Sequence, residues 1–232
     1  ANIKLKELDR LKSDFVANVA HEFRTPLTII KGNLDLVIKG KLGSVTSDQQ
    51  EMVQGAINVA TRLSRLVNDL LDISKIESGK IQLNKEPQNI NELIEKNLAV
   101  MDNIIKDKNQ VLHKDLAKDM PKINIDIDKI TQVLINLIGN AIKYSPPGTT
   151  IKVTSVNLEK EIMVCVLDTG EGIAPGDRDK IFDKFTRVTA EKKEGTGLGL
   201  PIARDIIVLH KGRMWVQSGV GKGSQFYFTL PK

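Results

Sequence analysis

Apolar residues recur every three or four positions from Leu8 to Val37. The positions are Leu8, Leu11, Phe15, Val19, Phe23, Leu27, Ile30, Leu34 and Val37. This spacing places the apolar side chains on one face of a helix, so it predicts one long amphipathic helix. The following segment, 40–48 (GKLGSVTSD), contains turn and helix-capping residues. It therefore predicts that the first helix ends there and that another begins.

A second helical pattern follows this turn. Its apolar positions are Val53, Ala56, Ala60, Leu63, Val67, Leu70 and Ile73, with Leu66 and Ile76 widening the stripe. Ser78 and Gly79 are typical of a helix end, because glycine readily adopts the left-handed conformation that often terminates a helix. Residues 1–79 are therefore predicted to form a helical hairpin. Two helices cannot cover both apolar stripes, so we expect a homodimer in which two hairpins form a four-helix bundle.

The pattern changes after a short linker, which we place at 80–87. From there to the end, predicted helices (91–105, 128–144 and 200–210) alternate with predicted strands (150–158, 161–168, 213–218 and 224–231). Strands covered by helices on one side make an α+β sandwich. The chain is thus predicted to be multi-domain, with the sandwich as a second domain at 88–232.

Composition narrows the class of protein. Hydrophobic residues make up 41% and charged residues 27%, as in ordinary globular proteins, and aromatic residues only 4%, so the core should consist of Ile, Leu and Val. The net charge of +5 is modest and no Lys/Arg run has interleaved aromatics, which excludes nucleic acid as a predicted partner. Cys165, the only cysteine, is expected to be a small buried apolar residue.

No apolar stretch approaches the ~20 residues that a membrane-spanning helix needs. We therefore expect a cytoplasmic location for this part of the protein. The chain starts at Ala1 rather than at Met and is already helical there, as a fragment would be. A membrane anchor or sensor domain would then belong to a missing N-terminal region.

Three segments of the second domain carry groups suited to phosphate and magnesium chemistry. In the first, Asn136, Asn140 and Lys143 share one helix face because they are spaced four and three residues apart. Amide oxygens are suitable Mg²⁺ ligands, and lysine suits phosphate. Taken alone, the same spacing also fits a solvated helix face.

The second segment is Asp168-Thr-Gly-Glu-Gly172, directly after a predicted strand. A carboxylate there could accept a hydrogen bond from an exocyclic amine such as that of adenine, and the glycines would let the base approach the backbone. An isolated D-x-G-x-G would more simply be a turn.

The third segment, Gly195-Thr-Gly-Leu-Gly-Leu-Pro201, leads into a predicted helix. Free amides at a helix start attract anions, and closely spaced glycines remove side chains that would block a phosphate. Pro201 suits the first helical turn. The segment is not a Walker motif, because it lacks the G-K-[ST] ending.

The order of these segments, with Phe182-Asp-Lys-Phe185 between the second and third, resembles the ATP-binding domain shared by histidine kinases, type II topoisomerases, heat-shock ATPase chaperones and MutL mismatch-repair proteins. The resemblance implies ATP and Mg²⁺ as cofactors, with Asn140 as magnesium ligand and Asp168 bound to adenine. The other implied nucleotide-binding residues are Asn136, Lys143, Tyr144, Gly170, Gly172, Arg187, Gly195, Thr196, Gly197, Leu198, Gly199 and Leu200. Residues 188–194 would form a short lid, and Phe182 and Phe185 could equally be core aromatics.

The first helix carries the other resemblance. His21-Glu-Phe-Arg-Thr-Pro-Leu27 resembles the phosphoacceptor motif of histidine kinases. His21 lies outside the apolar stripe, so it should face solvent, and neutral imidazole is a competent nucleophile. By resemblance Glu22 assists proton transfer and Thr25 positions water in a phosphatase reaction, although Thr25 could simply be a β-branched residue before proline. Pro26 should kink the helix, unless a very stable helix merely tolerates it.

Together these resemblances imply an ATP-dependent protein-histidine kinase. It would phosphorylate itself on His21, pass the phosphoryl group to an aspartate of a response regulator, and also act as a phosphatase of that regulator. One alternative is an ATP-gated clamp, which would have no use for the motif at His21. Another is a non-catalytic scaffold, against which the intact Asn140 and Asp168 argue. His210, before Lys211 and Gly212, is interpreted as a helix-capping residue, with a cation at the negative end of the helix and glycine at its exit.

Overall fold

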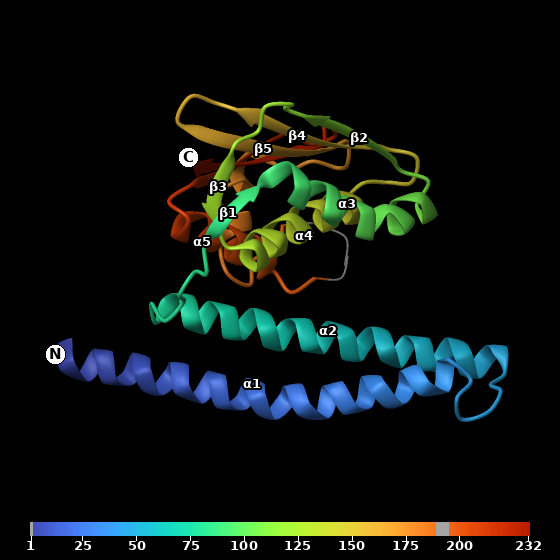
Figure 1. The fold of residues 1–232 in the computed structure, drawn as a ribbon. Helices are drawn as coiled ribbons and strands as arrows, with labels where there is room; N and C mark the ends of the chain where they lie inside the picture. Colours follow the sequence, from blue (N-terminus) through green and yellow to red (C-terminus); the bar gives the residue numbers. More distant parts are fainter. Residues whose placement is uncertain (1, 189–194) are drawn as a thin grey trace. The chain divides into compact units, whose positions relative to one another are not determined.

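The computed structural model describes residues 2–188 and 195–232, the side chains of 2–14 and Ala17 excepted. The chain forms two compact units, residues 1–81 and residues 82–232. Figure 1 shows two long helices in the first unit, and a sheet with helices in the second.

The first unit is the predicted helical hairpin of α1 (Asn2–Ile38) and α2 (Ser47–Glu77). Thr46 caps α2: its side chain accepts from the Gln49 N–H while the Gln49 side chain accepts from the Thr46 N–H. Such a reciprocal pair satisfies two backbone donors that the first turn of a helix leaves free. α1 continues through Pro26.

The hairpin buries few of its apolar side chains. Ala20 and Leu27 of α1 pack with Val67 and Leu71 of α2 in one buried cluster. Larger apolar side chains stay exposed on both helices, namely Phe15, Phe23, Ile29, Ile30, Leu36, Met52, Val59, Leu63 and Leu70. Two helices alone therefore leave much of the two apolar stripes uncovered, as their width predicted.

The second unit is the predicted α+β sandwich. Its five-stranded sheet has the order β2-β4-β5-β7-β6, from Val111–Leu116 (β2), Thr150–Asn157 (β4), Glu161–Asp168 (β5), Ser224–Pro231 (β7) and Arg213–Ser218 (β6). Helices α3 (Ile90–Asp107), α4 (Ile127–Tyr144) and α5 (Gly199–Leu209) cover one face of this sheet (Figure 1). The fully buried side chains are almost all Ile, Leu and Val, with Phe228 as the one aromatic among the largest described.

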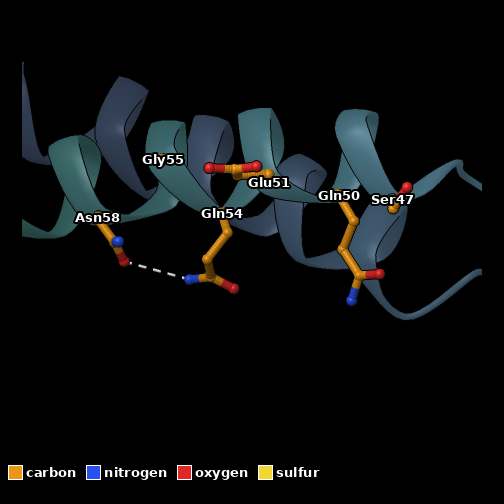
Figure 2. A pocket seen from close by; sticks show the side chains of 6 residues that line it. All are labelled: Ser47, Gln50, Glu51, Gln54, Gly55 and Asn58. Carbon is orange, nitrogen blue, oxygen red and sulfur yellow. Dashed lines mark hydrogen bonds between the residues drawn. The ribbon is translucent and has the colours of Figure 1, made fainter.

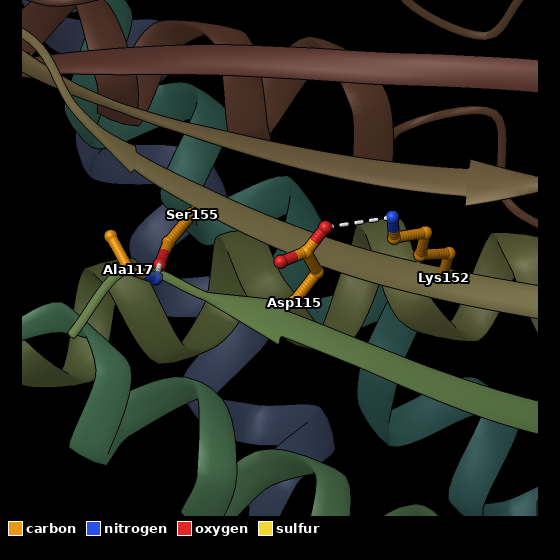
Figure 3. A network of polar contacts seen from close by, with 4 residues as sticks. All are labelled: Asp115, Ala117, Lys152 and Ser155. Carbon is orange, nitrogen blue, oxygen red and sulfur yellow. Dashed lines mark hydrogen bonds and ion pairs between the residues drawn. The ribbon is translucent and has the colours of Figure 1, made fainter.

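Strand β2 was not expected, because its exposed positions carry His113, Lys114 and Asp115 and hide the strand pattern. It lies at the sheet edge, where it pairs with β4 in parallel, whereas the other pairs in the sheet are antiparallel. Figure 3 shows the side chains that hold this pair: Lys152 binds Asp115 at 2.8 Å, and the Ala117 N–H donates to Ser155 Oγ at 3.1 Å.

Two further strands, β1 (Glu86–Asn89) and β3 (Lys122–Ile125), form a separate antiparallel pair. Each has only four residues. β1 (EPQN) has no alternation of polar and apolar positions, whereas β3 (KINI) alternates strictly and was missed. Glu86 and Pro87, which the sequence assigns to the linker, pair with Ile125 and Asn124 and so belong to β1.

His210 caps the end of α5, as predicted, but it does so as a neutral ring and not as a cation. Its side chain is only 2% exposed, and its Nε2 lies 3.0 Å from the backbone nitrogen of Asp126. A backbone N–H only donates, so Nε2 must be the unprotonated acceptor. Burial, the largest cause, lowers the pKa of His210 from its ordinary value, which keeps the ring neutral.

Cys165 is buried, as predicted, and burial raises the pKa of its thiol to about 11. A thiol that holds its proton at neutral pH is a poor nucleophile. The structure therefore supports a packing role for Cys165.

Candidate functional site

The candidate nucleotide site is assembled from α4, the end of β5 and the glycine-rich segment before α5. Asn136, Asn140, Lys143 and Tyr144 are all partly exposed on α4, whose opposite side is buried against the sheet. The helix starts at Asp126, whose carboxylate caps it by accepting from the Lys129 N–H at 3.0 Å. The four predicted side chains thus lie on the accessible side of a well-anchored helix.

A first contact joins α4 to the glycine-rich segment Gly195–Pro201, called the phosphate segment below. Asn136 Nδ2 donates to the Gly199 carbonyl at 3.1 Å, and a Cβ on Gly199 would lie 3.0 Å from Asn136 Oδ1. Such a distance is tighter than most side-chain contacts, so a side chain at position 199 would force the amide of Asn136 to shift. Glycine at this position keeps the start of α5 against the amide of Asn136.

A second contact joins Lys143 to the start of the same segment. Lys143 Nζ donates to the Tyr144 hydroxyl at 2.9 Å and lies 4.4 Å from the centre of the Tyr144 ring. A Cβ on Gly195 would lie 2.9 Å from that same Nζ. The ammonium group of Lys143 is therefore next to the glycine-rich segment, where it can bind a phosphate.

A third contact brings the segment after β5 to the end of α4. A Cβ on Gly170 would lie 2.5 Å from the Tyr144 carbonyl oxygen. Asp168 is 5% exposed, and its Oδ1 accepts from the Gly170 N–H at 2.9 Å. Burial raises the pKa of Asp168, while hydrogen bonds from the backbones of Gly170 and Ser224 act in the opposite direction.

Gly172 lets the loop after β5 pack closely against the turn between β6 and β7. Its φ is +73°, and a Cβ there would lie 1.9 Å from the Gly219 carbonyl oxygen in the β6–β7 turn. Gly223 in that turn also has φ +73°, and a Cβ on it would lie 2.0 Å from the Asp168 carbonyl oxygen. Glycine is required at these close approaches. This turn was missed as part of the site, although three glycines within Gly219–Gly223 could have indicated it.

The segment 182–188 packs against the phosphate segment. The Phe185 N–H donates to the Gly197 carbonyl at 3.1 Å, and Gly197 has φ +70°. Phe185 is 66% exposed, so it is not a core aromatic, and Phe182 is partly exposed with the Arg204 guanidinium 5.2 Å from its ring centre. The predicted lid falls almost wholly on residues 189–194, which lie outside the described residues.

The remaining predicted nucleotide residues differ in exposure. Leu198 is fully buried and Leu200 partly buried, so Leu198 anchors the segment by its side chain. Thr196 Oγ1 accepts from the Leu198 N–H at 3.1 Å and shapes the turn before α5. Arg187 is exposed.

The donor set fits Mg²⁺ held mainly by a nucleotide. Among the described residues no cluster of three or more His, Cys, Asp or Glu side chains could hold a metal. Among the described residues, the side chain of Asn140 has no hydrogen-bond partner, and it is partly exposed. Mg²⁺ typically takes one or two protein ligands together with phosphate and water oxygens, which is what a lone amide oxygen would allow.

The three residues predicted for the phosphoacceptor site lie on α1. His21 is exposed, as its position outside the apolar stripe predicted, and Glu22 and Thr25 are exposed as well. Nearby, Arg24 donates to Asn68 Oδ1 of α2 at 2.9 Å, and the Thr28 hydroxyl donates to the Arg24 carbonyl at 2.9 Å. The segment around His21 is thus tied to α2 while the imidazole remains accessible.

A shallow polar depression on α2 has none of this chemistry (Figure 2). It is lined by Ser47, Gln50, Glu51, Gln54, Gly55 and Asn58, all exposed. Gln54 donates to Asn58 at 3.2 Å. It lacks the cluster of charged and glycine residues found at α4 and α5.

An α+β sandwich with this amide, lysine and carboxylate set defines the class of ATPase-type domains. Residues 125–232 match the family described as histidine kinase-, DNA gyrase B-, and HSP90-like ATPase. Residues 11–79 match the His Kinase A (phospho-acceptor) domain. The chain belongs to the sensor histidine kinase family.

Individual proteins with similar sequences or structures carry names of the same family. Sensor protein SrrB of Staphylococcus aureus is 37% identical over 97% of this chain, which spans 39% of the length of that relative. The histidine kinase AdeS of Acinetobacter baumannii is 30% identical, with a TM-score of 0.65, over 91% of this chain and 97% of that one.

Two further structures were solved as complexes. ShkA with AMPPNP is 28% identical with a TM-score of 0.79, over 94% of this chain and 45% of that one. ThkA with the response regulator protein TrrA is 28% identical with a TM-score of 0.67, over 100% of this chain and 66% of that one. Among the described residues, none of the helices is both long and apolar enough to cross a membrane.

Proposed function

We propose that this chain binds ATP with Mg²⁺ and transfers the γ-phosphoryl group to His21, from which it passes to an aspartate of a response regulator. The main support is the convergence of three segments far apart in sequence, through the contacts of Asn136 with Gly199, Lys143 with Gly195 and Tyr144 with Gly170. The exposed His21 in its phosphoacceptor motif supplies the acceptor. The AMPPNP complex of the related ShkA supports a nucleotide ligand.

The proposed first step needs a neutral imidazole. A nitrogen of His21 forms a bond to the γ-phosphorus while the bond from that phosphorus to the bridging oxygen breaks, so that ADP leaves. The Glu22 carboxylate then takes the proton from the phosphorylated ring. Bound Mg²⁺, with Asn140 as its protein ligand, would neutralise negative charge on the phosphates.

In the second step an aspartate oxygen of the receiver domain attacks the phosphorus and the phosphorus–nitrogen bond to His21 breaks. The complex of ThkA with TrrA supports a partner of this kind. Thr25, exposed one turn after His21, has a hydroxyl suited to holding the water that would later hydrolyse the aspartyl phosphate. We further propose that the hairpin dimerises through its exposed apolar side chains, and that the chain acts in the cytoplasm.

Replacing His21 with Gln tests the phosphoacceptor. Incubation with γ-labelled ATP should label the parent protein and leave the His21→Gln protein unlabelled, because an amide nitrogen is not nucleophilic. The His21→Gln protein should still bind ATP, since the substitution changes no nucleotide-binding residue. The label on the parent should be lost in acid, as expected of phosphohistidine.

The control is His113→Gln, which changes an exposed histidine of β2 and should be labelled like the parent. Equal labelling of the His21→Gln protein, or acid-stable label, would contradict the assignment. A parent that hydrolyses ATP without acquiring label would favour the ATP-gated clamp, and one that only binds ATP would favour the scaffold.

Replacing Asn140 with Asp tests the magnesium ligand. A carboxylate in place of the amide adds a negative charge beside the triphosphate and changes how the metal is held. Labelling from ATP should fall at least tenfold at ordinary Mg²⁺ concentrations, about 1.4 kcal/mol or more, while the far-ultraviolet circular dichroism stays unchanged. A rate equal to that of the parent would remove Asn140 from the metal site.

A further inference from the structure

His210 and Asp126 are two buried residues that no step of the proposed reaction uses. The Asp126 N–H donates to His210 Nε2 at 3.0 Å, and His210 Nδ1 lies 2.8 Å from the Ile206 carbonyl. Because Nε2 accepts, the ring proton is on Nδ1, which donates to that carbonyl. The side chain of His210 therefore connects the last turn of α5 to the start of α4.

This connection lies at the far end of the two helices from the phosphate segment. Asp126 precedes α4 and His210 follows α5, whereas Asn136 and Gly199 meet at the other end of the contact. The helical stretches from Asp126 to Asn136 and from Gly199 to His210 are each roughly 15 Å long at 1.5 Å per residue. The first half of α4 and the whole of α5 thus run antiparallel, joined by one hydrogen bond at each end of their contact.

Asp126 also fixes the chain that leads into the domain. One carboxylate oxygen accepts from the Lys129 N–H and caps α4, and the other accepts from the Asn84 N–H at 2.9 Å. With its N–H donated to His210, Asp126 uses its backbone and both carboxylate oxygens. The residue is therefore held from three sides, so the start of α4 has little freedom to move.

We propose that His210, acting with Asp126, is a positioning residue for the phosphate-binding side of the nucleotide site. By holding α4 and α5 at a fixed spacing, it keeps Asn136 and Asn140 opposite the Gly195–Gly199 segment. This inference rests on the proposed function, since it concerns how the same site grips ATP. It does not extend to the adenine side, which Asp168 forms at the end of β5.

The positioning requires neutral His210. A proton on Nε2 would face the Asp126 N–H, donor against donor, and break the hydrogen bond. Besides burial, Lys85 disfavours the charged ring, whereas the Ile206 carbonyl and the Asp126 carboxylate favour it. ATP affinity should therefore fall as the pH drops below the ordinary pKa range of histidine. This pH dependence should be absent when residue 210 cannot titrate.

The test compares two substitutions. His210→Gln can place its amide oxygen where Nε2 lies and accept from Asp126, but it does not titrate. His210→Leu fills a similar volume and leaves the Asp126 N–H buried without an acceptor. Binding of Mg²⁺-ATP is measured by calorimetry at pH 7.5 and 5.0, and binding of adenosine by ligand-observed NMR, with His113→Leu as the control.

At pH 7.5 the His210→Gln protein should bind ATP within about twofold of the parent, and the His210→Leu protein about tenfold more weakly, since a buried donor without acceptor is costly. Adenosine binding should be unchanged in both. Between pH 7.5 and 5.0 the parent should lose more ATP affinity than His210→Gln does.

Equal ATP affinity of His210→Leu and the parent would overturn the inference. So would an equal loss of ATP and adenosine binding, which would indicate a general effect on folding. If His210→Leu does not fold, the comparison of the two pH profiles decides alone, extended to the pH at which NMR shows the His210 ring of the parent to be protonated: identical profiles for the parent and His210→Gln over that range would refute the positioning role. A parent that binds neither ligand would contradict the proposed function itself.

Discussion

Asp168→Asn should weaken ATP binding by an order of magnitude or more and, at neutral pH, should make the domain harder to unfold. The first effect follows from the loss of an acceptor for the adenine amine, because a hydrogen bond to a charged group is worth about 1.5–3 kcal/mol. Calorimetry with Mg²⁺-ATP measures it. The substitution thus lowers the ATP affinity and raises the free energy of unfolding, which means that the carboxylate favours ATP binding at the expense of stability.

The second effect comes from the raised pKa of Asp168. The folded protein binds this proton more tightly than the unfolded chain, so the contribution of Asp168 to stability is complete below its unfolded pKa of 3.8 and is lost as the pH rises through its folded pKa. At neutral pH the buried carboxylate therefore destabilises the fold. Asparagine carries no charge and can still accept from the Gly170 N–H.

Thermal unfolding at pH 7.5 and 4.0 checks the sign. The Asp168→Asn protein should be more stable than the parent at pH 7.5, and this advantage should shrink at pH 4.0. Asp115→Asn is the control, because Asp115 is an exposed carboxylate on β2 that pairs with Lys152. It should bind ATP like the parent and change stability by at most about 1 kcal/mol. Unchanged ATP affinity in Asp168→Asn would show that adenine binds elsewhere.

Gly172→Ala should disrupt the nucleotide-binding domain. The new methyl group would lie 1.9 Å from the Gly219 carbonyl oxygen, a backbone atom that cannot move aside as a side chain can. The left-handed φ of +73° adds about 1–2 kcal/mol for a residue with a side chain. We expect a loss of stability of several kcal/mol in total, at the upper end of single substitutions, and with it the loss of ATP binding.

Chemical denaturation followed by circular dichroism measures this loss. Gly176→Ala is the matched control, because Gly176 is exposed, has no atom within 4 Å of the added Cβ and does not have a left-handed φ. It should unfold like the parent. A Gly172→Ala protein as stable as the Gly176→Ala protein would mean that the loop after β5 and the β6–β7 turn can separate without cost.

Periodic patterns located most elements closely. The predicted strands 161–168, 213–218 and 224–231 have the observed bounds, and the predicted helix 128–144 starts one residue after α4 does. These elements bury one face against a shared core, so their sequences alternate at the period of the structure. β1 is short and polar and β2 is a polar edge strand, so neither carries such a signal, whereas β3 alternates at the period of a strand and was missed.

The candidate site was predictable in its parts but not in its contacts. The glycine-rich segment could be recognised because closely spaced glycines before a helix are typical of phosphate binding. The sequence does not show that Gly199 contacts Asn136 or that Gly170 contacts the Tyr144 carbonyl. His210 was misread for the same reason. The charge of a histidine depends on its partners, and the Asp126 N–H that decides it comes from a residue 84 positions away.

The exposed apolar side chains of α1 and α2 have one further consequence. In the proposed dimer, each folded hairpin is stabilised by association with its partner. Diluting the protein shifts the equilibrium toward monomers and so lowers the stability of the hairpin. Its melting temperature should then rise with protein concentration, whereas the α+β sandwich, which buries its core within one chain, melts independently of concentration. The amount of this protein in a cell would thereby set how much of its hairpin is folded.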